Sequence, residues 1–197
     1  EGAELAMRLA NHLSLLLTVT GRPLAPGEEI VVAYGDRTGG GPGSRAQTFF
    51  EDRRRFWIEV DAEGTGAFTP VPDPPQLRII GGTASRLVVV APSTVLVGEP
   101  FRVLVKAEDA WGNPAAAYRG RVRLEAAGFA VPSAELEFRQ ADEGLRSLEG
   151  CRGREPGVHR ISARDVQAHL RAQSNPVIVS IQPPAYRLCW GDPHGGQ

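Results

Sequence analysis

The sequence predicts an all-β protein. Gly (23) and Pro (16) are abundant among the 197 residues, a composition that suits many short strands joined by tight turns. Apolar and polar residues alternate repeatedly between Phe101 and Phe138, as in strands with one buried face. About seven short strands fall within about 100 residues, the number and spacing of an immunoglobulin-like sandwich. We therefore expect an immunoglobulin-like β-sandwich preceded by a smaller β-domain, complete or truncated.

The first part of the chain contains weaker strand patterns. Leu13, Leu15, Leu17 and Val19 recur at period two and predict a strand. Further strands are expected at 29–34 and 56–60, and the charged residues before the latter, 51–55, are expected to form a solvated turn. The Gly-rich stretch 35–44 is interpreted as a flexible structural or edge loop, with an anion site as the alternative, because a phosphate-binding loop would end in Gly-Lys-Ser/Thr and precede a helix.

A Pro-rich stretch, 70–85, divides the chain. It lacks periodicity and is interpreted as a stiff connector. We place a domain boundary near Gly82, which gives an N-terminal β-domain over 1–82, the sandwich over 83–182, and a linker with a first strand of a further domain over 183–197.

The strands of the sandwich follow in order. Each either alternates between apolar and polar residues or forms a short apolar run. They are expected at 87–91, 101–108, 121–126, 134–139, 145–148, 158–163 and 177–181. The stretch 165–172 is the one candidate for a short helix.

Composition excludes several classes of function. The net charge of −1 provides no basic field for nucleic acid. The longest apolar run, 15–19, is too short to span a bilayer, so no membrane insertion is expected, and no signal peptide is visible. Cys151 and Cys189 have no metal-ligand spacing and are interpreted as buried free thiols, with a disulfide as the alternative. The compartment stays open.

A turn with a distinctive sequence joins two strong strands. Asp109-Ala-Trp-Gly-Asn-Pro114 contains four residue types that favour reversals. It resembles the Asp-x-x-Gly-Asn-Pro turn of bacterial immunoglobulin-like repeats of the invasin and intimin kind, which implies a spacer or binding module over residues 85–181. Trp111 is expected to pack across the end of the sandwich, with an exposed contact residue as the alternative.

No catalytic set is apparent in most of the chain. His12, His159 and His169 are far apart and have no Cys or carboxylate at ligand spacing, so they are interpreted as structural or surface residues. There is no Gly-x-Ser-x-Gly elbow of a serine hydrolase. We predict no catalytic residues in the chain.

Asp192 and His194 are the exception. Side chains two residues apart in an extended chain point to the same side, and Pro193 favours extended geometry at Asp192. The preceding residues, 186–190, are expected to form a strand. Carboxylate oxygen and imidazole nitrogen suit Zn²⁺, Mn²⁺ or Fe, although a catalytic zinc ion needs about three protein ligands.

The segment Trp190-Gly-Asp-Pro-His-Gly-Gly-Gln197 resembles the Trp-Gly-Asp-Leu-His-Gly-Gln segment of the domain-of-unknown-function 3604 family. The stretches Tyr34-Gly-Asp-Arg37, Val90-Ala-Pro-Ser93 and Glu108-Asp-Ala-Trp-Gly-Asn-Pro114 resemble that family in the same order. The resemblance implies the start of a metal-dependent phosphoesterase domain of the PHP type, with Asp192 and His194 as first-motif metal ligands. Pro193 departs from the family's Leu.

These observations predict the non-catalytic N-terminal β-region of a larger PHP-like, metal-dependent hydrolase. The divalent metal would be bound only in the full-length protein, and the principal partner would be the C-terminal catalytic domain of the same chain. The alternative is a bacterial immunoglobulin-like binding, adhesion or spacer module.

Overall fold

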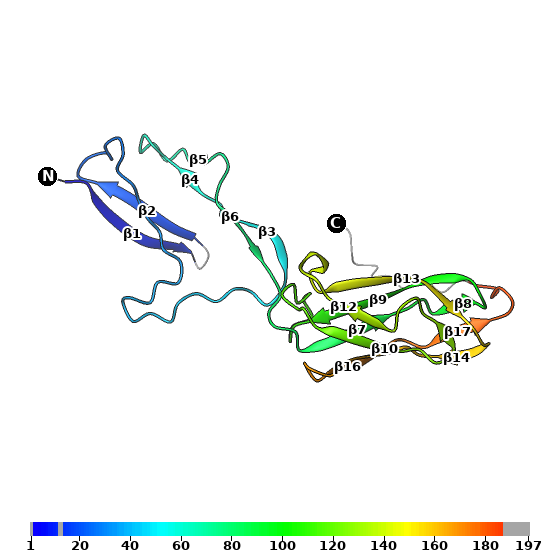
Figure 1. Ribbon diagram of the computed structural model, residues 1–197. Coiled ribbons are helices and arrows are strands. Elements are labelled where there is room, and N and C mark those ends of the chain that lie inside the picture. The colour runs from blue at the N-terminus through cyan, green and yellow to red at the C-terminus, as the bar shows by residue number, and fades with distance from the viewer. Residues whose placement is uncertain (1, 12–13, 187–197) are drawn as a thin grey trace. The chain divides into compact units, whose positions relative to one another are not determined.

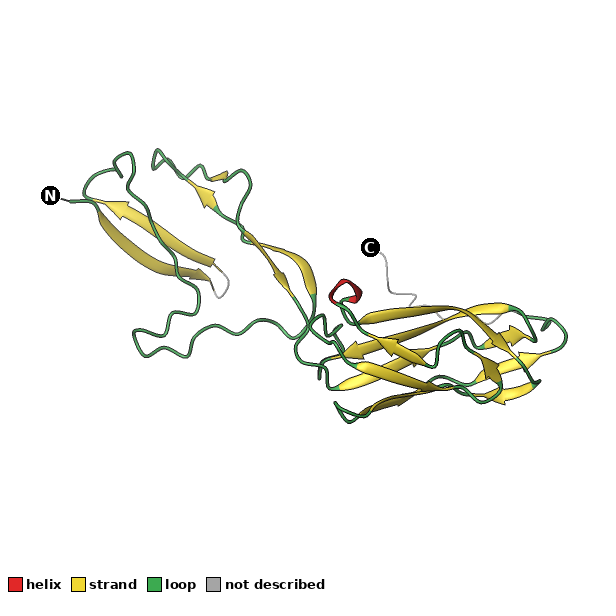
Figure 2. Cartoon of the chain, viewed as in Figure 1, coloured by secondary structure: helices red, strands yellow, loops and turns green. Residues whose placement is uncertain are grey.

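The computed structural model describes residues 2–11 and 14–186. The chain divides into two compact units, Glu1–Arg45 and Ala46–Gln197. Within the described residues the regular elements are strands, apart from one 3-10 helix, η1 (Gln140–Asp142) (Figure 2). The prediction of an all-β protein is confirmed. The division lies well before Gly82, because residues 46–80 contact the sandwich through hydrogen bonds described below.

The first unit is built on one hairpin. β1 (Glu4–Asn11) pairs antiparallel with β2 (Ser14–Thr20), from Glu4 opposite Thr20 to Asn11 opposite Ser14. The strand predicted over 29–34 does not form, and Val31 within it is 81% exposed. Apolar alternation alone does not produce a strand there, because the backbone N–H and C=O groups also need a neighbouring strand to pair with and otherwise bind water.

Residues 46–80 form a two-stranded arm. β3 (Glu51–Arg55) pairs with β6 (Gln76–Ile79), and β4 (Glu59–Val60) pairs with β5 (Thr69–Pro70), both antiparallel. The predictions of a turn at 51–55, of one strand over 56–60 and of a connector over 70–85 are therefore wrong. A ribbon of two strands has only edges, where proline is tolerated because the missing N–H can face water.

The sandwich contains two four-stranded sheets and a three-stranded sheet (Figure 1). The first four-stranded sheet has the order β11 (Phe129–Ala130), β13 (Leu145–Gly153), β9 (Pro100–Glu108), β7 (Arg86–Val90). The second has the order β12 (Glu135–Glu137), β10 (Arg121–Glu125), β15 (Ser162–Asp165), β16 (Leu170–Gln173). The third has the order β14 (Gly157–His159), β17 (Val177–Ser180), β8 (Thr94–Leu96), with β8 parallel to β17.

The strand order is that of an immunoglobulin-like sandwich. β7, β9 and β13 occupy the A, B and E positions of one sheet, and β10, β15 and β16 the C, F and G positions of the other. The connection between β10 and β13 differs from the constant-type order. β11 pairs with β13 before β12 returns to pair with β10.

Residues that alternate along the strands fill the space between the sheets. Val103 and Val105 of β9, Val122 of β10 and Ile161 are fully buried. Each such side chain contributes on the order of 1.5–3 kcal/mol through burial. In β13 the buried positions Leu148 and Cys151 lie three residues apart, because the register shifts between them at a β-bulge.

Two other expectations are settled in this unit. The candidate helix at 165–172 is instead the end of β15, a turn, and the start of β16. Cys151 is a buried free thiol, as predicted, and burial raises its pKa, whereas Cys189 lies outside the described residues. Among the residues placed in the structure, none forms an apolar helix long enough to cross a membrane.

Candidate functional site

The predicted metal ligands, Asp192 and His194, lie outside the described residues, as does all but Tyr186 of the strand expected over 186–190. Over residues 2–11 and 14–186, no group of three or more His, Cys, Asp or Glu side chains is arranged to hold a metal ion. The metal site therefore stays a prediction from sequence.

Of the remaining histidines, His12 is also outside the described residues. His159 lies in β14, where its ring packs edge-on against Phe129 at 5.6 Å and its Nε2 lies 3.0 Å from the carbonyl oxygen of Glu155. His169 is in the turn between β15 and β16 with φ of 56°. These are structural and surface positions, in agreement with the prediction.

The Gly-rich loop at 35–44 contains an acid at its start. The Asp36 carboxylate accepts hydrogen bonds from the backbone N–H and the hydroxyl of Thr38, each at 2.8 Å. These bonds lower the pKa of Asp36 and so favour its charged form. A fixed negative charge at this position opposes the binding of an anion.

The turn at 109–114 is organised around the Asp109 carboxylate. Its Oδ1 accepts hydrogen bonds from the backbone N–H groups of Trp111 and Asn113, both at 2.9 Å. Its Oδ2 accepts one from the N–H of Gly82, also at 2.9 Å, and the Asn113 side chain bonds to both oxygens. These hydrogen bonds, with that of the Asn113 side chain first, lower the pKa of Asp109 far below its usual range.

Asn113 connects this turn to the arm. Its Nδ2 donates to the carbonyl oxygen of Thr48 at 2.8 Å, and its Oδ1 accepts from the N–H of Phe50 at 2.8 Å. Arg78 of β6 supplies a second connection through a two-pronged contact with Glu143, 2.9 Å for each bond. Asn113 therefore connects the sandwich to the arm in addition to forming the turn.

Trp111 does not pack across the end of the sandwich, so that expectation is wrong. Its side chain is 70% exposed, although Asp109 holds its backbone in place. The reason is geometric: Asp109 draws the backbone N–H groups of the turn inward, and the tryptophan side chain is left on the outside. An exposed indole on a fixed turn is a feature found at binding surfaces.

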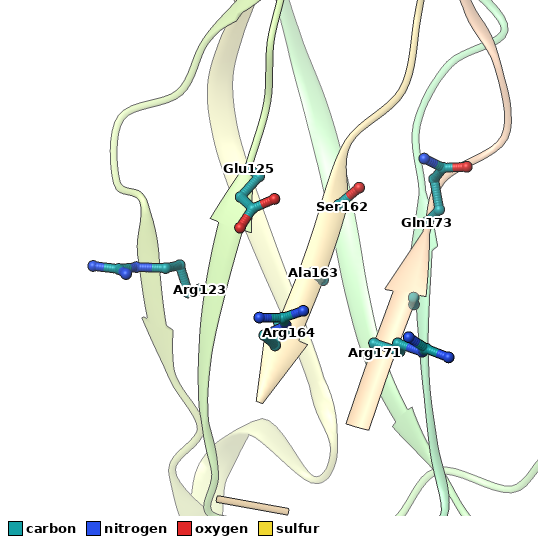
Figure 3. A pocket seen from close by; sticks show the side chains of 8 residues that line it. Arg123, Glu125, Ser162, Ala163, Arg164, Arg171 and Gln173 are labelled. Atoms are coloured by element: carbon teal, nitrogen blue, oxygen red, sulfur yellow. The ribbon is translucent and has the colours of Figure 1, made fainter. Parts of the chain in front are cut away.

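A second feature lies on the outer face of the sheet β12-β10-β15-β16. A shallow groove of about 370 Å³ is formed there by outward side chains of β10, β15 and β16 over the backbone of Ala163 and Ala172, whose side chains face the core. Three arginines form one row across the strands, since Arg123 is paired opposite Arg164 and Arg164 opposite Arg171. Figure 3 shows Arg164 and Arg171 on neighbouring strands and Arg123 pointing away from them.

The next row on this face is Glu125, Ser162 and Gln173, again in register across the three strands. The sequence displays these residues as separate polar positions in three strands. Their assembly into rows depends on the pairing register, which local sequence patterns do not reveal. The alternation of charged and apolar residues at 121–125 was the signal in the sequence that one face of this strand is charged.

The interior of the sandwich also contains a polar pair that the sequence did not indicate. The hydroxyl of Tyr118 donates a hydrogen bond to Oδ2 of Asp165, and both residues are buried. Burial, with the hydrogen bond to Asp165 as the next cause, raises the pKa of Tyr118 above its usual range. The pair is enclosed by the core and serves the fold.

The chain is similar to three proteins of the genus Chlamydia. It is 27% identical over 154 residues to an uncharacterized protein of Chlamydia trachomatis serovar D, 26% identical to one of Chlamydia pneumoniae and 27% identical to one of Chlamydia muridarum. Each match covers 78% of this chain and 24% of the relative. The chain thus spans about a quarter of the length of these curated relatives. No family model matches the chain.

Proposed function

We propose that this chain is the N-terminal β-region of a longer, PHP-like metal-dependent hydrolase, and that Asp192 and His194 contribute to its metal site. The observation that carries the proposal is the position of the pair relative to the sandwich. Both four-stranded sheets and the β8–β17 pairing are built from residues up to Ser180. Asp192 and His194 follow β17 in the sequence.

The donor chemistry agrees with the proposal. One carboxylate and one imidazole are ligands that Zn²⁺, Mn²⁺ and Fe accept, and a bound ion of this kind activates water for attack on a phosphoester. Two ligands are fewer than a catalytic site needs, so others would have to come from a further part of the protein. The longer relatives, of which this chain matches 24%, are in keeping with such a part.

The test uses the product of the complete open reading frame. We expect the purified protein to contain a stoichiometric divalent metal and to hydrolyse bis(p-nitrophenyl) phosphate. Asp192→Ala and His194→Ala should each lower metal content and turnover by about 100-fold, because direct ligands matter at least as much as the groups that orient them. His169→Ala, at an exposed turn, is the matched control. Unchanged metal content and turnover in both ligand variants would reject the proposal.

A second function, a binding module without chemistry, is favoured by Trp111. A tryptophan that is 70% exposed on a turn fixed by Asp109 can enter a pocket of a partner at little entropic cost. Peptides selected on the chain from a displayed library should then bind Trp111→Ala at least tenfold more weakly. Trp57→Ala, which alters an indole that is 79% exposed in the arm, is the control.

The sequence downstream of Gln197 separates the two functions. Further His, Asp and Glu motifs at strand ends would support the hydrolase. Further Asp-x-x-Gly-Asn-Pro turns would support the binding module.

A further inference from the structure

The arginine row on the outer face of the second sheet places like charges next to one another. Arg164 lies directly opposite Arg123 on one side and Arg171 on the other. Like charges at directly opposed positions of a sheet are destabilising. Removing the repulsion would require only an uncharged residue at one of these exposed positions.

The acidic residues of this face do not neutralise the whole row. Glu135 of β12 lies 3.8 Å from Arg123, and Glu137 lies 3.9 Å from Arg121, so the acidic residues of β12 form ion pairs with the arginines of β10. Within the described residues, Arg164 and Arg171 make no ion pair and no side-chain hydrogen bond. Two exposed guanidinium groups on adjacent strands are therefore available to an external anion.

The spacing of these groups suits a carboxylate. Adjacent strands are about 4.8 Å apart, so the two guanidinium groups can both donate hydrogen bonds to one carboxylate or to two adjacent ones. Arginine is the side chain suited to such two-pronged contacts and is enriched at protein interfaces. The groove gives an acidic side chain room to lie against the backbone of Ala163 and Ala172, whose side chains face the core.

Glu125 determines which kind of anion fits. It belongs to the next row, with Ser162 and Gln173, two residues further along the strands. A uniform polyanion would place negative charge against the Glu125 carboxylate. A polypeptide of mixed charge avoids this conflict. The row separation of about 6.7 Å equals the separation of side chains i and i+2 in an extended peptide, and Glu125 lies one strand, about 4.8 Å, to the side of Ser162, within reach of a long basic side chain.

We propose that this face binds an extended segment of a partner protein that carries Asp or Glu at one position and Lys or Arg two positions away. The acidic side chain contacts Arg164 and Arg171, and the basic side chain contacts Glu125. Ser162 and Gln173 supply polar contacts beside the second side chain. This inference is independent of the metal site and of Trp111.

The test is an array of extended peptides in which Glu-x-Lys, Glu-x-Glu and Lys-x-Lys are compared at otherwise constant sequence. The probe is the 197-residue chain, and binding of the best peptide is then measured in solution by fluorescence anisotropy. We expect Glu-x-Lys peptides to bind best. The double variant Arg164→Gln, Arg171→Gln should weaken binding at least tenfold, and Glu125→Gln should remove the preference for Glu-x-Lys over Glu-x-Glu.

A matched control keeps the change in charge the same. Arg53→Gln with Arg102→Gln removes two exposed arginines from the arm and from the outer side of β9, and should bind as the wild type does. The Arg164 and Arg171 variants are expected to unfold no earlier than the wild type, since they relieve repulsion.

Three outcomes would overturn the proposal. The first is the absence of saturable peptide binding up to millimolar concentration. The second is tighter binding of Glu-x-Glu peptides or of a sulfated oligosaccharide through the same arginines, which would identify a polyanion site. The third is concentration-dependent self-association that the double variant abolishes, which would identify a second copy of the chain as the occupant.

Discussion

The hydroxyl of Tyr118 donates a hydrogen bond to Oδ2 of Asp165 inside the sandwich, where the two residues are 9% and 2% exposed. Oδ1 of Asp165 accepts hydrogen bonds from the backbone N–H groups of Gln167 at 2.9 Å and Ala168 at 3.0 Å. One buried carboxylate thus joins the segment before β10 to the turn between β15 and β16. Tyr118 also packs edge-on against Phe138 at 4.9 Å.

The Tyr118→Phe substitution should destabilise the second unit. It keeps the ring in the core but leaves Oδ2 of the buried Asp165 without its donor, a loss of about 1–3 kcal/mol in the free energy of unfolding. Urea unfolding followed by tryptophan fluorescence measures the change. Tyr186→Phe, at a position that is 87% exposed, should stay within about 0.5 kcal/mol of the wild type. Equal stability of all three proteins would contradict the prediction.

The same pair predicts a loss of stability at high pH. The pKa of Tyr118 is raised in the folded protein by burial and by Asp165, whereas in the unfolded chain it is near 10.0. Above that pH the unfolded state releases a proton that the folded state retains, so stability is present below pH 10 and falls as pH rises. This group contributes a slope of up to about 1.4 kcal/mol per pH unit. Unfolding at pH 8–11 should show a shallower slope for Tyr118→Phe.

Much of the sandwich could be predicted because its strands are half-buried. Phe101, Val103, Val105 and Ala107 alternate in the sequence and are all buried in β9. Period-two alternation reports which face of a strand is inside, and here that signal is strong. It was weaker in β13, where the bulge between Leu148 and Cys151 breaks the period.

The features that could not be predicted depend on pairing between distant strands. The alignment of Arg164 with Arg123 and Arg171 in one row is set by register, and the Tyr118–Asp165 hydrogen bond spans 47 positions. Local sequence patterns carry no information about either. The strands of the arm could not be predicted for a related reason. Its prolines indicate a connector, and the pairing of β3 with β6 joins segments that are separated in the sequence. Asp192 and His194 stay a prediction from motif and spacing.

Two neighbouring glycines should differ in their response to substitution by alanine. A Cβ added to Gly81 would lie 2.1 Å from the backbone oxygen of Pro114, whereas one added to Gly82 would meet nothing nearer than 3.8 Å, on Asp109. We expect Gly81→Ala to cost about 1–3 kcal/mol, because the backbone must move. Gly82→Ala keeps its N–H donor and should be nearly neutral.

The location of the Gly81→Ala effect can be checked by hydrogen exchange. Displacement of Pro114 should disturb its neighbour Asn113 and so weaken the bond from the Phe50 N–H to Asn113. The Phe50 amide should therefore exchange faster in Gly81→Ala and at the wild-type rate in Gly82→Ala. Equal exchange in the two variants would show that the close approach of Gly81 does not hold the arm in place.

Acid should destabilise the turn at 109–114 through Asp109. Hydrogen bonds lower the pKa of this carboxyl in the folded protein below the 3.8 of an unperturbed aspartate. A lowered folded pKa stabilises the protein above pH 3.8, and this contribution is lost as pH falls below that value. Asp109→Asn also replaces one carboxylate oxygen by an amide NH2 group, which faces either the N–H of Gly82 or the N–H groups of Trp111 and Asn113. The variant should therefore be less stable at pH 7 and lose less stability between pH 4 and pH 2. Against the effect of burial, ion pairs with Lys106 and Arg86 lower the pKa of Glu108, which is present in both proteins, so the difference between their acid unfolding curves isolates Asp109. Glu99→Gln, at an exposed position, is the control, and parallel curves for wild type and Asp109→Asn would refute the prediction.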